Sequence, residues 1–384
     1  MIKILFFIPD LSGGGAEKVL RNLVNNMDQS RFDITVHTIN ACDSAKYLVE
    51  GIRYRAINRC RSRWSKKLME YWFRLCTELK WTYPLYIKDD YDIEVAYLEC
   101  GATKVMAAST NEKALKLAWV HCDLQKKGVT GEKTKKQYEK FDKVICVSED
   151  TRRAFVECFG ESIDSVVLHN VIDEEEIFEK AKNALPEACR WEHSRILAVG
   201  RLTQQKAFDR LIEACACLKN TGYKFQLKIL GEGPERAKLE GMIANYDLRD
   251  CVELCGFCDN PYPYIKAADM VVCSSEYEGL STVVLESLML GKAIVTTPCT
   301  GMQELLGESQ YGLIVDGNAK ALAQGIQRLM DDPELAAQYA DAALKRGQSF
   351  YKKAVVEKTE AFLIATAERR VYNNDKGFCN DSNG

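Results

Sequence analysis

The clearest chemistry in the sequence belongs to two glutamates eight positions apart, Glu278 and Glu286. Gly279 follows the first one. The run 268–273 before it has the pattern of a short buried strand, and 282–290 has the pattern of a helix start. A helix N-terminus offers unpaired N–H groups and a positive dipole end to an anion such as phosphate. A carboxylate about one turn into that helix accepts hydrogen bonds from hydroxyls such as a ribose diol. The spacing therefore predicts a site for a sugar phosphate.

A second group of residues suited to chemistry begins where an apolar strand ends at Gly200. Arg201 and Lys206 follow, five positions apart, before the next helical pattern. Arginine offers a planar fork of donors and lysine a point charge, so both suit a diphosphate. Both cations can therefore converge on one diphosphate. The alternative interpretation is that both are solvated surface cations, as most lysines and arginines are.

These segments resemble motifs of the family 4 retaining glycosyltransferases. Gly-rich turns at strand ends are individually weak signals, so the order and spacing of the motifs carry the resemblance. The matching segments are the E-x7-E signature from Glu278 to Glu286, the G-R-L-x-x-x-K-G pattern from Gly200 with Ala207 in place of its last glycine, the G-x-G-P loop at Gly231-Glu232-Gly233-Pro234, and the base-contacting strand end at Gly256-Phe257.

The resemblance implies the GT-B fold, an α/β architecture of two Rossmann-like α/β/α domains that face a central cleft. It also implies retaining transfer of a hexose or N-acetylhexosamine from a nucleotide-sugar, most simply UDP-linked, to a glycan or lipid-linked glycan acceptor in bacterial-type surface polysaccharide assembly. No cofactor and no catalytic metal are expected. The implied catalytic residues are Glu278 near the anomeric centre, Arg201 and Lys206 at the diphosphate, and His121 at the donor sugar. The implied substrate-binding residues are Gly14, Gly15, Glu99, Gly200, Gly231, Gly256, Phe257, Gly279, Leu280, Ser281, Thr282 and, at the ribose, Glu286.

Strand and helix patterns alternate along the chain, which predicts parallel sheets covered on both faces. The resemblance places an acceptor-binding domain at 1–178, a nucleotide-sugar-binding domain at 190–350 and a helix at 351–372 that crosses back to the first domain. Residues 373–384 are expected to form a disordered tail. The predicted strands are 2–8, 32–39, 93–98, 115–120, 143–147, 165–168, 195–200, 225–230, 252–254, 270–273, 293–296 and 312–315.

Composition narrows the class of protein further. The formal net charge of −3 does not favour nucleic acid as a partner. No apolar run reaches about 18 residues, so no transmembrane helix is expected. The apolar start at 2–8 is short and leads into Pro9 rather than a cleavage site, so we expect no signal peptide and a cytoplasmic protein. The glycine loop at 13–15 lacks both the dinucleotide fingerprint and the Walker pattern, which disfavours a dinucleotide site.

Neither the cysteines nor the paired aspartates favour a metal site. The 16 cysteines are scattered through a long chain, which fits reduced, partly buried thiols. Cys255 and Cys258 form a C-x-x-C that has no second close pair of ligands, as a zinc site usually requires. Asp90 and Asp92 form a D-x-D, but it precedes a predicted strand and suits a turn.

Residues 59–88 mix basic and aromatic side chains, and Glu70 and Glu78 are the only acidic residues among them. This mixture favours a helix that lies on an anionic membrane surface, so we expect a peripheral protein on the inner face of the cell membrane. A half-buried helix with a solvated basic face and a nucleic-acid groove are the alternatives. A second basic group in the same domain consists of Lys126, Lys127, Lys133, Lys135 and Lys136.

Two other functions remain open from the sequence. A nucleotide-sugar epimerase of the same fold would use the same donor site without an acceptor. A non-catalytic nucleotide-sugar-binding subunit would bind the donor without turnover.

Overall fold

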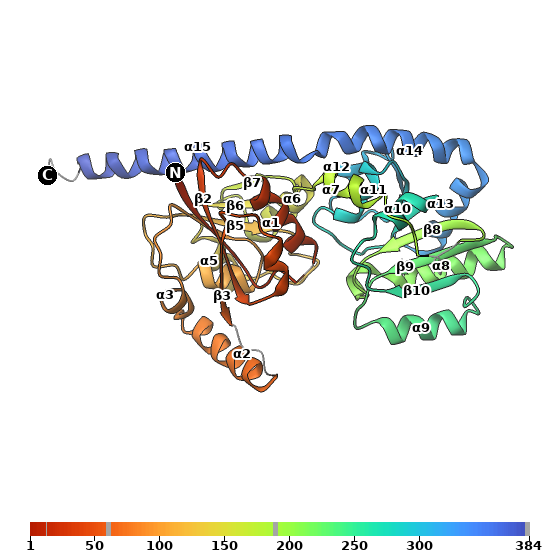
Figure 1. Ribbon diagram of the computed structural model, residues 1–384, viewed down its shortest axis with the longest axis horizontal. Helices are drawn as coiled ribbons and strands as arrows, with labels where there is room; N and C mark the ends of the chain where they lie inside the picture. The colour runs from red at the N-terminus through yellow and green to blue at the C-terminus, as the bar shows by residue number, and fades with distance from the viewer. Residues whose placement is uncertain (13, 59–62, 187–190, 381–384) are drawn as a thin grey trace. The chain divides into compact units, whose positions relative to one another are not determined.

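The computed structural model describes residues 1–12, 14–58, 63–186 and 191–380, and their side chains except those of 63–68, 70 and 370–380. The chain divides into two compact units. The first consists of residues 1–171 together with 352–384, and the second of residues 172–351. Figure 1 traces both units from red at the N-terminus to blue at the C-terminus.

The first unit is built on a parallel sheet whose seven described strands have the order β3-β2-β1-β4-β5-β6-β7. Strand β1 is central and its residues 4–8 are fully buried, because helices cover both faces of such a sheet. The elements are β1 (Ile2–Ile8), α1 (Gly15–Asn26), β2 (Phe32–Asn40), η1 (Asp43–Tyr47), β3 (Arg53–Asn58), α2 (Arg63–Glu78), α3 (Thr82–Tyr86), β4 (Ile93–Ala96), α4 (Gly101–Met106), β5 (Leu115–Val120), α5 (Glu132–Tyr138), β6 (Lys143–Cys146), α6 (Glu149–Phe159), β7 (Ser165–Val167) and α15 (Lys352–Asn380).

The second unit repeats this architecture with a parallel sheet whose six described strands have the order β10-β9-β8-β11-β12-β13. Its core joins the sheet to helices α8, α9 and α13 through buried aliphatic side chains such as Leu211, Ile229 and Ile326. The elements are α7 (Glu174–Lys180), β8 (Ser194–Val199), η3 (Gln204–Lys206), α8 (Phe208–Asn220), β9 (Phe225–Leu230), α9 (Arg236–Asn245), β10 (Val252–Gly256), α10 (Tyr262–Ala267), β11 (Met270–Cys273), α11 (Thr282–Met289), β12 (Ala293–Thr296), α12 (Met302–Leu306), β13 (Leu313–Ile314), α13 (Ala319–Asp331), α14 (Pro333–Gly347) and η4 (Gln348–Phe350).

The last helix, α15, belongs to the first unit and not to the second. Leu363 is fully buried, and the Glu360 carboxylate accepts a hydrogen bond from the Asp28 backbone N–H at 2.6 Å. Figure 1 shows this blue helix beside the red strands of the first sheet. The helix extends to Asn380, beyond the predicted end near 372. The residues that follow 372 contain no proline that would stop it.

Sequence and structure agree closely on the buried strands. Strands β5, β9, β11 and β12 match their predicted ranges residue for residue, because each is a short apolar run between polar turns. Strand β3 was missed because it is an edge strand whose side chains are mostly half-exposed. Residues 172–178 belong to the second unit rather than the first, and one reason is that Asn260 donates a hydrogen bond to the Lys180 carbonyl at the end of α7.

Candidate functional site

The strand order of the second sheet explains why segments distant in sequence meet at one place. Strands β8 and β11 are neighbours, with Ile196 opposite Met270, and the strand order reverses between them. In open parallel sheets, ligands bind at this switch point, outside the carboxyl ends of the strands. The loop after β8 carries Lys206 and the loop after β11 carries Glu278. Two of the predicted residues are therefore placed together by topology.

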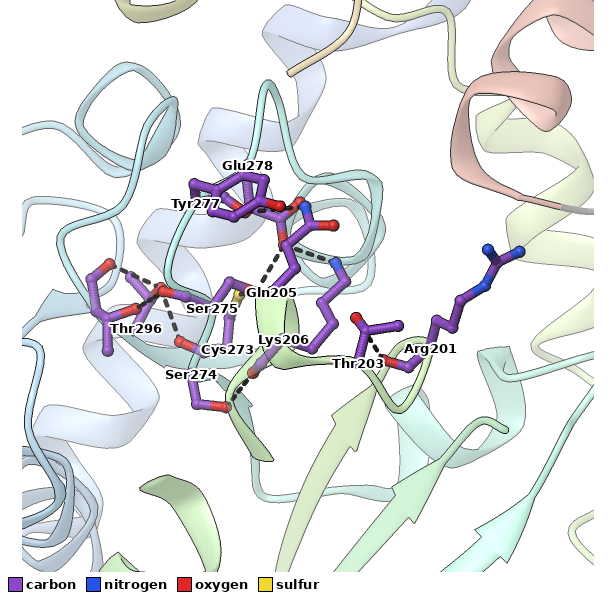
Figure 2. A network of polar contacts seen from close by, with 11 residues as sticks. Arg201, Thr203, Gln205, Lys206, Cys273, Ser274, Ser275, Tyr277, Glu278 and Thr296 are labelled. Carbon is purple, nitrogen blue, oxygen red and sulfur yellow. Dashed lines mark hydrogen bonds and ion pairs between the residues drawn. The ribbon is translucent and has the colours of Figure 1, made fainter. Parts of the chain in front are cut away.

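Lys206 and Glu278 form an ion pair at this switch point (Figure 2). The Lys206 Nζ lies 2.6 Å from the Glu278 Oε1, and the Ser275 hydroxyl donates to the same oxygen at 2.7 Å. The Glu278 side chain is only 9% exposed. Burial lowers the pKa of Lys206, but the Glu278 carboxylate raises it more, so the net pKa is raised. The Lys206 ammonium therefore stays charged although it is largely shielded from solvent.

Arg201 takes a different position from the one expected. It is exposed, and in Figure 2 its guanidinium extends away from the Lys206–Glu278 pair. The Lys206 ammonium is bound to a carboxylate instead of facing the same point as the arginine. The two cations therefore lie apart, with Glu278 as the partner of Lys206, and their convergence on a diphosphate stays a prediction.

The glycine loops of the predicted site lie against one another. The Gly231 N–H donates to the Gly256 carbonyl at 2.8 Å, and the Gly200 N–H donates to the Leu230 carbonyl at 2.9 Å. Gly231 has a φ of +150°, and a Cβ there would lie 1.8 Å from the Gly200 carbonyl oxygen. Only glycine fits such an approach. The neighbouring Phe257 is 71% exposed and leaves an aromatic face open at the end of β10.

Helix α11 begins in the predicted place. Ser281 is its N-cap and Thr282 its first residue, with buried Gly279 and Leu280 leading into it. Glu286 lies in the second turn and is 3% exposed. The Tyr262 hydroxyl donates to its carboxylate at 3.4 Å. The predicted loop and helix positions of the two glutamates are therefore confirmed.

Ala207 explains why glycine is usual at its position. Its backbone has a φ of 45° and a ψ of 46°, in the left-handed region, directly between η3 and α8. An L-residue with a Cβ pays roughly 1–2 kcal/mol in this conformation. The turn that follows Lys206 is thus reached at some strain, and the contacts described below hold it in place.

Some of the residues that hold the site together had no sequence signal. The Gln205 side-chain amide donates to the Tyr277 carbonyl at 3.0 Å, and the Ser274 hydroxyl donates to the Lys206 carbonyl at 2.8 Å. The Thr297 hydroxyl donates to the Ser275 carbonyl at 2.6 Å. Each contact joins a side chain to a backbone group distant in sequence, so only the fold brings the partners together.

The predicted residues of the first unit lie at the carboxyl end of its sheet. The order of strands reverses between β1 and β4. Gly14 is the N-cap of α1 after β1, and Gly15 is that helix's first residue. Glu99 follows β4 and His121 follows β5. These residues therefore share one edge of the first sheet, near its switch point.

Glu99 is buried, although it was expected to contact the acceptor. It is 4% exposed and accepts hydrogen bonds from Lys127 Nζ at 2.7 Å, from Cys122 Sγ at 3.0 Å and from the His121 N–H at 3.3 Å. Burial raises the pKa of Glu99, but Lys127 and the other partners lower it by more, so the net pKa is about 2. The carboxylate thus joins the ends of β4 and β5, and Lys127, which the sequence placed in a basic group, is its ion-pair partner.

His121 lies in an aromatic cluster. Its ring is 4.8 Å from that of Tyr97 and stacks on Trp119 at 6.2 Å between centroids. Its Nε2 atom is buried and has no hydrogen-bond partner among the residues that the structure describes. Burial lowers the pKa of His121 to about 4. The imidazole is therefore neutral at physiological pH and suits hydrogen bonding rather than charge pairing.

This geometry makes a prediction for the titration of His121. Because its pKa is near 4, its ring signals in nitrogen-15 NMR should stay constant between pH 7 and pH 5.5, well above the midpoint. A His121→Gln variant identifies the signal by its absence. A midpoint at pH 6 or above would show that the imidazole is solvated and would contradict the buried position.

Asp92, the second aspartate of the D-x-D, has a structural role. The Asp92 carboxylate accepts the Lys3 N–H at 2.8 Å and so fixes the start of β4 beside β1. Within the described ranges, no group of three His, Cys, Asp or Glu side chains is arranged to hold a metal ion. The Cys255 and Cys258 thiols donate to the backbone carbonyls of Glu253 at 3.9 Å and Asn260 at 3.2 Å.

The two parallel-sheet α/β units together have the GT-B fold. Solved structures support this: the Anabaena protein HepE in complex with UDP-glucose superposes with a TM-score of 0.75 at 19% identity, covering 95% of this chain and 100% of that one. Sucrose-phosphate synthase from Thermosynechococcus elongatus superposes with a TM-score of 0.73 at 18% identity, covering 95% and 99%.

Sequence comparison identifies the family. The model for Glycosyltransferase Family 4 matches residues 13–176, and the model for Glycosyl transferases group 1 matches residues 187–346. The chain belongs to the family 4 glycosyltransferases.

Individual relatives act in bacterial glycan assembly. One is the N-acetylgalactosamine-N,N'-diacetylbacillosaminyl-diphospho-undecaprenol 4-alpha-N-acetylgalactosaminyltransferase of Campylobacter jejuni, 33% identical over 230 residues. That match covers 59% of this chain and 61% of the relative, so the chain spans less than two thirds of that relative's length. The amylovoran biosynthesis glycosyltransferase AmsD of Erwinia amylovora is 24% identical over 371 residues, which cover 94% of this chain and all of that protein.

Proposed function

We propose that the chain transfers a hexose or N-acetylhexosamine from a UDP-linked sugar, with retention of configuration, to a glycan acceptor in bacterial surface polysaccharide assembly. The observation that carries the proposal is the sheltered Lys206–Glu278 pair at the switch point of the second sheet, beside the N-terminus of α11. An ammonium, a helix N-terminus and a carboxylate together suit a phosphate next to a sugar. Family membership and the relatives' names support it.

Each residue then has a role in the reaction. The donor diphosphate takes the place of Glu278 as the partner of the Lys206 ammonium, and the exposed Arg201 side chain swings to the same phosphates. Glu278 turns to the hydroxyls of the donor sugar. Glu286 accepts hydrogen bonds from the ribose, and Phe257 lies against the base. Charge that develops on the leaving group is then stabilised by the Lys206 and Arg201 cations.

Retention follows from attack on the face that the leaving group departs from. The bond between the anomeric carbon and the phosphate oxygen breaks, and a bond from the acceptor oxygen to that carbon forms on the same face. The departing phosphate takes the proton of the acceptor hydroxyl, so atoms and charge balance. In the first unit, neutral His121 and the backbone of Gly14 and Gly15 offer hydrogen-bonding groups at the carboxyl end of the sheet.

The acceptor is proposed to be lipid-linked, with the chain peripheral on the inner face of the cell membrane. In the described part of the chain, no helix has both the length and the apolar character to cross a bilayer. Helices α2 and α3 nevertheless leave apolar side chains exposed beside the basic residues Arg74, Lys80 and Lys88. The exposed set, here called the apolar α2–α3 surface, consists of Tyr71, Trp72, Leu75, Leu79, Trp81 and Leu85.

That surface fits a membrane interface better than bulk water. Aromatic and aliphatic side chains enter the boundary between headgroups and acyl chains, while flanking cations attract anionic lipid at about 1 kcal/mol each. The cations expected at 61–67 lie where side chains or the backbone are outside the described residues. The apolar α2–α3 surface therefore carries the testable part of the proposal.

The membrane proposal predicts a specific loss of vesicle binding. Trp81→Ser with Leu85→Ser should weaken pelleting with vesicles of anionic phospholipid by about tenfold or more at high salt, because burying each large apolar side chain is worth about 1.5–3 kcal/mol. Tyr246→Ser, which removes an exposed aromatic from the second unit, is the matched control and should pellet like the wild type. Equal pelleting of all three proteins, or none of the wild type, would contradict membrane contact.

The activity itself is tested by incubating the protein with radiolabelled UDP-sugars and membrane extract. Label that moves to a lipid-extractable product supports glycosyl transfer. Conversion of the UDP-sugar without an acceptor would identify the epimerase alternative. Binding of UDP without either reaction would identify a non-catalytic subunit.

A further inference from the structure

Arg210 follows Lys206 by four residues and lies in the first turn of α8. Its Nη1 donates to the Ser274 carbonyl at 3.2 Å, and its Nη2 pairs with the Glu276 carboxylate. The Glu276 N–H in turn donates to the Gln205 carbonyl at 2.8 Å. Both acceptors of the guanidinium therefore belong to the loop that ends in Glu278.

The Arg210 contact differs from an ordinary surface ion pair. The Arg210 side chain is 16% exposed and Glu276 is 51% exposed, so the cation is sheltered while the carboxylate reaches it from outside. One planar fork holds a backbone carbonyl and a carboxylate two residues apart, which a single ammonium cannot do with the same geometry. The fork therefore fixes the direction of the chain from Ser274 to Glu276.

We propose that Arg210 is a positioning residue that sets the place of Glu278 against Lys206. Arg210 and Lys206 flank the left-handed turn at Ala207. The guanidinium thus connects the loop after β11 to the same short segment that carries the catalytic lysine. With these contacts formed, the Glu278 carboxylate lies 2.6 Å from the Lys206 ammonium.

Loss of Arg210 is therefore expected to affect the turnover of the donor and not the binding of UDP. Loss of Arg210 should leave the ribose and base contacts of UDP intact, because these involve Glu286 and Phe257. It should displace the carboxylate that orients the donor sugar, and a misplacement of about 1 Å can cost about 10²-fold in rate. The effect on the donor sugar rests on the proposed function, whereas the effect on the loop does not.

The loop is tested first in the protein without any ligand, by hydrogen–deuterium exchange followed by mass spectrometry. Arg210→Ala should speed exchange in peptides that cover 274–278 by about tenfold, as expected when a hydrogen-bonded contact that closes the loop is lost. Lys219→Ala is the matched control, because it removes an ion pair with Asp250 from the far end of the same helix. Unchanged exchange in Arg210→Ala would overturn the proposal, whatever the activity of the protein.

The proposed effect of Arg210 on the reaction is tested by steady-state kinetics and by measuring the Kd for UDP. Arg210→Ala should lower kcat by about 10- to 100-fold, with the Kd for UDP within about twofold of the wild type. Arg210→Lys should recover part of kcat, since it retains the charge opposite Glu276. In a Glu278→Gln background, Arg210→Ala should have no further effect on kcat. A full additional loss in that background, or a parallel loss of UDP affinity, would show that Arg210 acts on general stability and not through Glu278.

Discussion

Replacing Lys206 with methionine should lower kcat by about 10²–10³-fold, the usual cost of removing a donor aimed at developing charge. Methionine keeps most of the apolar stem but removes the ammonium. In the wild type that ammonium is charged, sheltered and 2.6 Å from Glu278. A diphosphate leaving group therefore loses its nearest fixed cation in this variant. Steady-state kinetics with the labelled UDP-sugar measures the loss.

The control for Lys206→Met separates chemistry from folding. The single change leaves the Glu278 carboxylate sheltered without its cation, which costs stability, though less than the roughly 3–5 kcal/mol of a fully buried pair because Lys206 is 20% exposed. Lys206→Met with Glu278→Gln removes both charges and should restore much of the melting temperature without restoring kcat. Near-normal turnover of either folded variant would remove Lys206 from the diphosphate site.

Glu286→Ala should weaken UDP binding by about 10- to 150-fold, since hydrogen bonds to a charged group are worth about 1.5–3 kcal/mol. The carboxylate lies in the second turn of α11 and is 3% exposed, so a ribose diol that reaches it is sheltered from competing water. Isothermal titration calorimetry with UDP alone measures the effect without any acceptor.

Tyr262→Phe is the matched control for Glu286→Ala. It removes the hydroxyl that donates to Glu286 but leaves the carboxylate in place. Its Kd for UDP should stay within about threefold of the wild type, a change below 1 kcal/mol. If Glu286→Ala lowers the melting temperature while its UDP affinity equals that of Tyr262→Phe, Glu286 holds α10 against α11 and does not bind the ribose.

Sequence reasoning succeeded where a pattern is local. The apolar runs of β9 and β11 lie between polar turns, so their ranges were predicted residue for residue. The loop position of Glu278 and the helix position of Glu286 followed from the same local patterns. The GT-B architecture came from the resemblance of spaced motifs, and the solved structures confirm it.

Sequence reasoning failed where the partner is distant. Lys206 and Glu278 are separated by 72 positions, and no local pattern predicts the ion pair between them. Glu99 shows the same limit, because its burial depends on Lys127 and on the end of the neighbouring strand. Arg210 was overlooked because an arginine in the first turn of a helix is ordinarily solvated.

Hydrogen–deuterium exchange with and without UDP tests the central claim most directly, because it locates the nucleotide on the chain. The account predicts protection on UDP binding in peptides that cover 200–206, 231–233 and 278–286 of the second unit. It also predicts that this protection is largely lost in Glu286→Ala at a UDP concentration near the wild-type Kd. Protection confined to the first unit, or no protection anywhere at a UDP concentration that saturates the calorimetric signal, would contradict the assignment of the donor site.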